Sequence, residues 1–85
     1  MYNQRIDVRI GAAPWILKIE YGDGGIAALR YQDFNRALEF MNVVDEYFGS
    51  YTKLCLMSQA EFTTQAFERN HEEWLDLIED AEEIE

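Results

Sequence analysis

The sequence predicts an α+β fold in which a small antiparallel sheet, a three-stranded meander plus a fourth strand, packs against one helix and is followed by an acidic helical region (β-β-β-α-β-α-α). Three observations predict it: apolar residues alternate in the first third of the chain, apolar residues follow helical spacing over residues 34–48, and the last 25 residues hold ten acidic side chains against one basic one. With 85 residues and 48% hydrophobic content, the chain is expected to form one domain over 1–85. Residues 1–57 would form the sheet and the central helix, and residues 58–85 the acidic helical region.

The first third of the chain has the alternation of three β-strands. Apolar and polar residues alternate over residues 5–10 and again over 15–21, which is the period of a strand with one buried face. The Gly-Ala-Ala-Pro segment of residues 11–14 separates these two strands, because proline lacks the amide hydrogen that a sheet needs. The glycine-rich residues 22–25 favour a tight hairpin turn, and a third strand follows over residues 26–31.

A helix is expected over residues 34–48, with Asp33 as its N-cap and Gly49 directly after its end. Its main apolar stripe should face the sheet and consists of Phe34, Ala37, Leu38, Met41, Val44 and Phe48. A second apolar stripe lies on another side of this helix and consists of Phe40, Val43 and Tyr47. We expect the C-terminal helices to cover the second stripe, with a second copy of the chain as the alternative cover.

A fourth strand is expected over residues 51–57, and a helix should follow over residues 59–69. Ser58 and Glu61 match a capping box at the start of this helix, in which the serine hydroxyl accepts a hydrogen bond from an early amide. Two threonines weaken the helical pattern, so a strand over residues 62–67 remains the alternative.

The C-terminal segment has the pattern of an amphipathic helix, after a break or kink at Asn70. Its apolar stripe consists of Trp74, Leu77, Ile78 and Ala81. Four acidic residues share another face at i, i+3, i+4 and i+7, namely Asp76, Glu79, Asp80 and Glu83. Like charges at this spacing cost about 0.2–0.5 kcal/mol per pair, and acids near a helix C-terminus oppose the helix dipole. Stability alone would not favour this face, which leaves solubility or a basic partner as its explanation.

Charge and composition exclude several classes of function. A net charge of −10 opposes direct binding to nucleic acid and to anionic membranes. No apolar run is long enough to span a membrane and no signal-peptide pattern opens the chain, so a soluble, cytoplasmic protein is expected. The single cysteine, Cys55, cannot form an internal disulfide, which fits a reducing cytoplasm.

Neither catalysis nor the binding of a metal or cofactor has a supporting motif in the sequence. Cys55 lies in an alternating strand pattern typical of inert core cysteines, and His71, the single histidine, has no second histidine four residues away. The glycine-rich turn offers one carboxylate, Asp23, where a calcium loop needs several. We therefore expect no enzymatic activity, no metal and no cofactor.

The favoured function is non-enzymatic binding of a basic, nucleic-acid-binding protein by the acidic helix. As one helix, residues 70–85 would carry a carboxylate every ~3 Å of axis, close to the ~3.4 Å spacing of phosphates along a nucleic-acid strand. The expected partner contacts are Glu72, Glu73, Asp76, Glu79, Asp80 and Glu83, with Trp74 as an apolar anchor and Phe40, Val43 and Tyr47 as a candidate apolar interface.

In size, acidity and mixed α+β pattern, the chain resembles the small inhibitors that phages and mobile elements direct against host nucleases, repair enzymes and CRISPR effectors. This resemblance is one of composition, and it implies inhibition by nucleic-acid mimicry. The alternative function is a small structural or adaptor domain that works as a homodimer or subunit, with the acidic helix serving solubility only.

Overall fold

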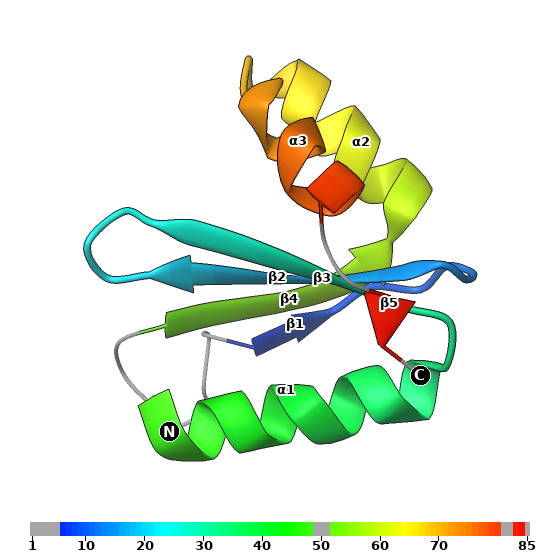
Figure 1. Ribbon diagram of the computed structural model, residues 1–85, viewed down its shortest axis with the longest axis vertical. Coiled ribbons are helices and arrows are strands. Elements are labelled where there is room, and N and C mark those ends of the chain that lie inside the picture. The colour runs from blue at the N-terminus through cyan, green and yellow to red at the C-terminus, as the bar shows by residue number, and fades with distance from the viewer. Residues whose placement is uncertain (1–5, 49–51, 81–82, 85) are drawn as a thin grey trace.

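The computed structural model describes residues 6–48, 52–80 and 83–84, and it shows a three-layer fold (Figure 1). Helix α1 lies on one face of a five-stranded sheet, and helices α2 and α3 lie on the other face. The elements are β1 (Ile6–Val8), β2 (Trp15–Tyr21), β3 (Ile26–Tyr31), α1 (Phe34–Phe48), β4 (Thr52–Ser58), α2 (Gln59–Glu68), α3 (Glu73–Asp80) and β5 (Glu83–Ile84). The predicted α+β class and the predicted order β-β-β-α-β-α-α of the first seven elements are confirmed.

The sheet has the strand order β1-β4-β2-β3-β5 and mixes both directions of pairing. β2 pairs antiparallel with β3 and β4, whereas β1 runs parallel to β4 and β5 runs parallel to β3. The prediction of a purely antiparallel sheet with a three-stranded meander is wrong at the first strand, because β4 lies between β1 and β2. β4 is buried on both faces through Leu54, Leu56 and Met57, as a central strand must be. β1 lies at the edge of the sheet and carries the exposed Asp7, and charged side chains are typical of edge strands.

The hairpin between β2 and β3 forms at the predicted glycine-rich turn. The amide of Tyr21 donates to the carbonyl of Gly25 over 2.8 Å, and the Gly25 amide donates to the Asp23 carboxylate over 2.9 Å. Gly24 has a φ of 94°, a value that residues with a side chain rarely adopt. The turn therefore depends on the glycine that marked it in the sequence.

The alternation of side chains along the strands produces two cores on opposite faces of the sheet. The core toward α1 consists of Trp15, Leu17, Ile19, Tyr31, Leu54 and Leu56 with Ala37, Met41 and Val44 of α1. The core toward α2 and α3 consists of Ile16, Ala28 and Met57 with Phe62, Ala66, Trp74 and Ile78. The main apolar stripe of α1 therefore faces the sheet, as predicted, through all of its members except Phe48, whose side chain lies outside the described part of the structure.

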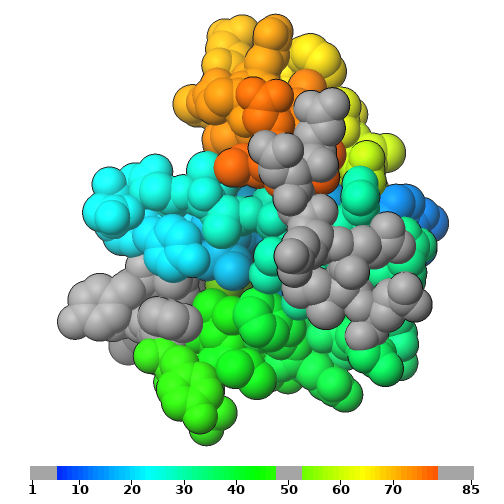
Figure 2. Space-filling view, in the orientation of Figure 1, coloured from blue at the N-terminus to red at the C-terminus, as the bar shows by residue number. Residues whose placement is uncertain are grey.

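Residues 59–68 form a helix, so the alternative of a strand over residues 62–67 is wrong. The Ser58 hydroxyl caps α2 by accepting a hydrogen bond from the Glu61 amide over 3.2 Å, as the capping box predicted. The chain turns at Asn70, whose φ of 57° is left-handed backbone, so the predicted break is confirmed. The space-filling view shows α2 and α3 as a raised lobe on the sheet (Figure 2).

The C-terminal end differs from the predicted helix that reaches Glu83. α3 ends at Asp80, and β5 pairs with β3, with Glu83 opposite Arg30 in the register. Pairing along the edge of β3 provides partners for main-chain groups, whereas a longer helix would add further like charges to one face. Three residues for which the sequence made predictions lie outside the described part of the chain: Gly49, Tyr51 and Ala81.

Candidate functional site

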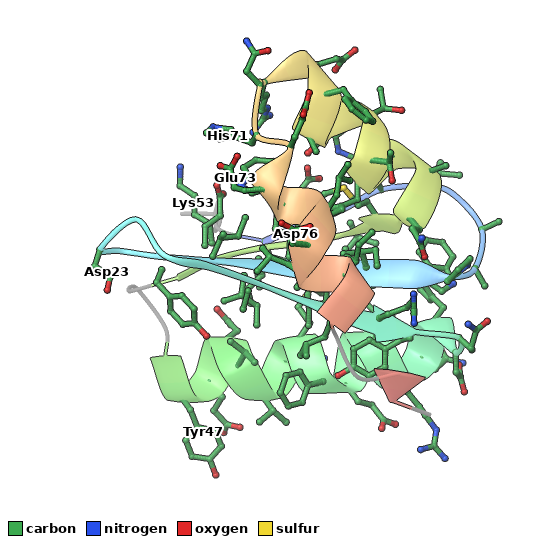
Figure 3. The ribbon with its side chains drawn as sticks, turned by 45° about the horizontal axis from the view of Figure 1, so that its top comes forward. Asp23, Tyr47, Lys53, His71, Glu73 and Asp76 are labelled. Carbon is green, nitrogen blue, oxygen red and sulfur yellow. The ribbon has the colours of Figure 1, made fainter. Side chains whose placement is uncertain are left out.

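α3 turns its apolar side to the sheet and leaves carboxylates outside. Trp74 and Ile78 are 7% and 5% exposed and pack into the core on the α2–α3 side. Four acidic residues of the α2–α3 lobe are exposed, and we call them the acidic surface: Glu68, Glu72, Glu73 and Asp76. Figure 3 shows Glu73 and Asp76 on the outside of this lobe. Three of the predicted contact residues, at positions 72, 73 and 76, are therefore accessible to a partner.

The start of α3 stabilises two of these acids. The Glu73 carboxylate lies 2.9 Å from Nδ1 of His71, and the pKa of Glu73 is lowered first by its own backbone amide at the helix start and then by His71. Glu73 and Asp76 occupy the first turn of α3, where the helix dipole favours negative charge. The expectation that the dipole disfavours Asp76 is therefore wrong, because the short α3 begins at Glu73 and places Asp76 near its N-terminus.

The predicted face of four carboxylates on one helix does not form. Glu79 and Asp80 lie in the last turn of α3, but Glu83 belongs to β5 and pairs with β3. In the part of the chain that the structure describes, residues 70–85 are not one continuous helix with phosphate-like spacing of charge. A match to nucleic acid must therefore come from the surface of the lobe and not from one straight row.

Trp74 is not accessible as an apolar anchor. Its ring stacks on Phe62 at a centroid distance of 6.0 Å and on His71 at 4.7 Å, and the Lys18 ammonium lies 4.7 Å from its centroid. The prediction of Trp74 as a partner contact is wrong, because the amphipathic pattern of α3 places this ring against the sheet.

The second apolar stripe of α1 is exposed to solvent. Phe40, Val43 and Tyr47 are 37%, 44% and 77% exposed, and Figure 3 shows Tyr47 pointing away from the sheet. The prediction that the C-terminal helices cover this stripe is wrong, because α2 and α3 pack on the opposite face of the sheet. Cover by a second copy of the chain is the alternative that this arrangement leaves.

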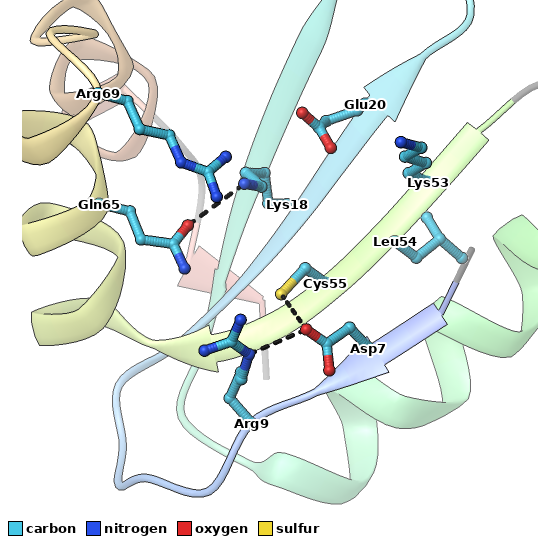
Figure 4. Close-up of a pocket in the computed structure, with 9 residues that line it drawn as sticks. All are labelled: Asp7, Arg9, Lys18, Glu20, Lys53, Leu54, Cys55, Gln65 and Arg69. Atoms are coloured by element: carbon cyan, nitrogen blue, oxygen red, sulfur yellow. Dashed lines mark hydrogen bonds and ion pairs between the residues drawn. The ribbon is translucent and has the colours of Figure 1, made fainter. Parts of the chain in front are cut away.

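A pocket of about 310 Å³ on the sheet face beside α2 is the site that the sequence did not reveal (Figure 4). It lies where Asp7, Cys55 and Lys18 are neighbours across β1, β4 and β2. Four cationic side chains line it: Arg9, Lys18, Lys53 and Arg69. The pocket therefore gathers four of the seven Lys and Arg residues of a chain with a net charge of −10.

A series of hydrogen bonds along one wall of this pocket joins α2 to the sheet. Arg9 donates to the Asp7 carboxylate over 2.9 Å and to the Glu61 carboxylate over 2.7 Å. Gln65 donates to the same Glu61 carboxylate and accepts from the Lys18 ammonium, each over 3.4 Å. The wall is therefore organised by side chains from β2, α2 and the end of β1.

The alternation along two strands is the signal that could have found part of this pocket. On β2, Lys18 and Glu20 share the face of Ile16, and on β4, Lys53 and Cys55 share the face of Met57. Along each strand, the residues on this face change from apolar to polar. Such a change indicates the point beyond which no helix packs on the sheet. The contributions of Arg9 and Arg69 depend on strand register and on the position of α2, which no local pattern contains.

The Cys55 thiol lines the pocket and is held in its neutral form. Burial raises the pKa of Cys55 to about 11, with the negative charge of Asp7 as the second cause. The reactive form of a cysteine is the thiolate, so Cys55 is a weak nucleophile at neutral pH. This agrees with the interpretation of Cys55 as an inert residue.

Among the described residues, no cluster of three or more His, Cys, Asp or Glu side chains could hold a metal ion. None of the described helices has the length and apolarity needed to cross a membrane. The candidate sites are the acidic surface, the second stripe of α1 and the pocket. No protein-family model, no curated protein and no solved structure matches the chain, so functional proposals must come from the geometry of these three sites.

Proposed function

We propose that this chain is a small non-enzymatic inhibitor that uses its acidic surface to occupy the basic, nucleic-acid-binding surface of another protein. The observation that carries the proposal is the separation of charge on the α2–α3 lobe. The four carboxylates of the acidic surface are exposed, whereas Arg69, the single cation of the last 25 residues, lines the pocket. The acidic surface therefore has no lysine or arginine partner from its own segment of the sequence.

The chemistry of such a contact follows from the side chains involved. Carboxylates form charge-assisted hydrogen bonds with the same Arg and Lys side chains that contact phosphates. A net charge of −10 accelerates the encounter with a basic protein and makes it sensitive to salt. The partner would lose access to nucleic acid, which is inhibition by mimicry of the kind that phages and mobile elements direct at host enzymes.

A competition experiment tests this proposal directly. Purified nucleases, repair enzymes and CRISPR effectors would each be bound to a fluorescent duplex, and its displacement by the chain would be followed by anisotropy. We expect displacement from at least one of these proteins, and weaker displacement as salt rises. A gel shift with the chain alone should show no binding to the duplex, and tight direct binding at physiological salt would contradict the proposal.

Two double variants with equal changes of charge give the matched control. Glu68→Lys and Asp76→Lys reverse two acids of the acidic surface, whereas a control set reverses two exposed acids of α1: Glu39→Lys and Glu46→Lys. We expect the first set to weaken displacement at least about tenfold and the control set to weaken it much less. Equal losses in both sets would show that only the net charge matters and that the acidic surface is no docking site.

A second candidate function is a homodimer or subunit built on α1. The observation that favours it is the exposure of Phe40, Val43 and Tyr47 along one side of that helix. Sedimentation velocity should then show a dimer, and Val43→Asp should dissociate it without unfolding, because an unpaired charge buried in an interface costs several kcal/mol. A monomer at every concentration would contradict this candidate and leave the inhibitor proposal unaffected.

A further inference from the structure

The pocket beside α2 contains a buried cation without an anionic partner. Lys18 is 4% exposed and lies in the central strand β2, with its ammonium beside Gln65 and the Trp74 ring. Among the described residues, no carboxylate lies within ion-pairing distance of Lys18, and its hydrogen bond to Gln65 is long at 3.4 Å. A buried charge is costly unless it is paired, so an anion in the pocket would relieve that cost.

Two carboxylates at the pocket wall, those of Asp7 and Glu61, are engaged by another cation. Asp7 and Glu61 both accept hydrogen bonds from Arg9, at 2.9 and 2.7 Å. Glu61 also accepts from Gln65, which turns the amide oxygen of Gln65 toward Lys18. This network holds Arg9 at the wall and pairs Asp7 and Glu61 with Arg9 instead of Lys18.

Two further cations contribute from the two sides of the pocket. Lys53 comes from β4 and Arg69 from the end of α2, and Figure 4 shows Arg69 reaching toward Lys18. Neither forms an ion pair with another side chain of the described residues. Glu20 and Asp7 also line the pocket, and together with Glu61 of the wall they leave the four cations in excess by one charge. The lining is therefore positive in a protein that is strongly negative as a whole.

We propose that this pocket binds a small oxyanion, namely inorganic phosphate or the phosphate group of a small monoester, between Lys18, Lys53 and Arg69. These side chains suit a phosphate, because the Arg69 guanidinium can donate two parallel hydrogen bonds to it and the ammonium groups of Lys18 and Lys53 act as point charges. A volume of about 310 Å³ accommodates phosphate together with a small organic group. The described residues that line the pocket include no aromatic ring on which a nucleobase could stack, which favours a small ligand over a nucleotide.

An NMR titration of the whole chain tests this site. Backbone amide spectra would be recorded with increasing inorganic phosphate, with glycerol 3-phosphate, and with chloride at matched ionic strength. We expect saturable shifts at residues 18, 55, 65 and 69 with the phosphate compounds and none that saturate with chloride. Tighter binding of glycerol 3-phosphate would identify a monoester, and tighter binding of phosphate would identify the free anion.

Charge-removing variants complete the test. Lys18→Met should weaken phosphate binding at least about tenfold, and Arg69→Gln on the exposed rim should weaken it about threefold or more without touching the core. Arg36→Met, which removes one positive charge from α1, should leave the affinity unchanged. No saturable shift up to about 20 mM phosphate, or unchanged affinity in folded Lys18→Met and Arg69→Gln, would overturn the proposal, as would binding of citrate but not phosphate.

Discussion

The ammonium group of Lys18 lies 4.7 Å from the centroid of the Trp74 ring, and this contact joins the central strand β2 to helix α3. The same indole stacks on Phe62 of α2 and on His71 of the turn between the helices. Lys18 and Trp74 therefore connect the sheet, both helices of the lobe and the wall of the pocket. Because one of the two residues is a buried cation, this connection makes the stability of the lobe and the chemistry of the pocket depend on the same side chain.

Lys18→Met should raise the free energy of unfolding by about 1 kcal/mol. Methionine keeps the apolar stem in place and removes a buried charge, and the relief of desolvation should exceed the lost cation–π contact of about 0.5–2 kcal/mol. Lys18→Ala should instead lower the free energy of unfolding by about 2 kcal/mol, because the apolar stem of the lysine is lost as well. Urea unfolding measures both variants, and a less stable Lys18→Met would show that the cation contributes net stability.

The Cys55 thiol should react slowly with a disulfide reagent at pH 8 and faster as the pH rises toward 11. Its pKa is about 11 against an ordinary value of 9.0, so its thiolate fraction at pH 8 is about a hundredfold smaller than that of an ordinary cysteine. Asp7→Asn should accelerate the reaction, because the charge of Asp7 helps to raise this pKa. Glu46→Gln on α1 serves as the control and should have no effect.

The raised pKa of Cys55 also has a consequence for stability. The unfolded chain loses the thiol proton near pH 9, whereas the folded chain retains it to about pH 11. The stability that the neutral thiol contributes is therefore complete below pH 9 and is lost as the pH rises toward 11. Cys55→Ala should show a smaller loss of stability over this range, and equal losses in both proteins would contradict the assignment.

Tyr31→Phe should raise the free energy of unfolding by about 1 kcal/mol. Tyr31 is 1% exposed, and within the described residues its hydroxyl has no hydrogen-bond partner. A buried hydroxyl without a partner costs about 1–3 kcal/mol, and phenylalanine removes it while keeping the ring. Tyr21→Phe, at an exposed tyrosine of the same hairpin, is the control and should change stability little. A destabilised Tyr31→Phe would mean that the hydroxyl is satisfied in solution.

Ser58→Ala should lower the free energy of unfolding by about 1 kcal/mol, because it removes the oxygen that accepts the Glu61 amide at the start of α2. Thr64→Ala deletes a hydroxyl from the same helix and gives the opposite sign. The Thr64 hydroxyl bonds to the Ala60 carbonyl inside the helix, and alanine has the better helix propensity, so stability should rise by a few tenths of a kcal/mol. Chemical unfolding of both variants distinguishes capping from a general effect of removing hydroxyls.

The parts of the fold that the sequence predicted are those specified by neighbouring residues. The bounds of α1, the glycine-rich turn after Tyr21, the cap at Ser58 and the break at Asn70 all come from patterns within a few residues. Each of these features is stabilised by local hydrogen bonds or by one apolar stripe, so the sequence contains the whole physical cause.

The errors arise where segments far apart in the chain compete for one place. β4, and not β1, lies beside β2 in the sheet. α2 packs on the face of the sheet opposite α1, and Phe40 of α1 is therefore exposed. The prediction of Trp74 as a partner contact treats it as an apolar anchor for the acidic face, although its place in the apolar stripe of α3 directs the ring inward. The pocket also depends on segments far apart in the chain. Lys18 and Arg69 come together only when α2 packs on the sheet.

β1 and β2 follow one another in the chain, but β4 lies between them in the sheet. Asp7 of β1 precedes its neighbour Cys55 of β4 by 48 residues. During synthesis β1 is therefore complete long before β4, the strand with which it pairs, has been made. During that interval the short link over residues 9–14 would allow a hairpin between β1 and β2, which is a non-native pairing that β4 must prevent or displace. We therefore expect nascent chains that stop before residue 52 to hold only the β2–β3 hairpin and α1 in native form. The emergence of β4 is then the step on which the native sheet depends during synthesis.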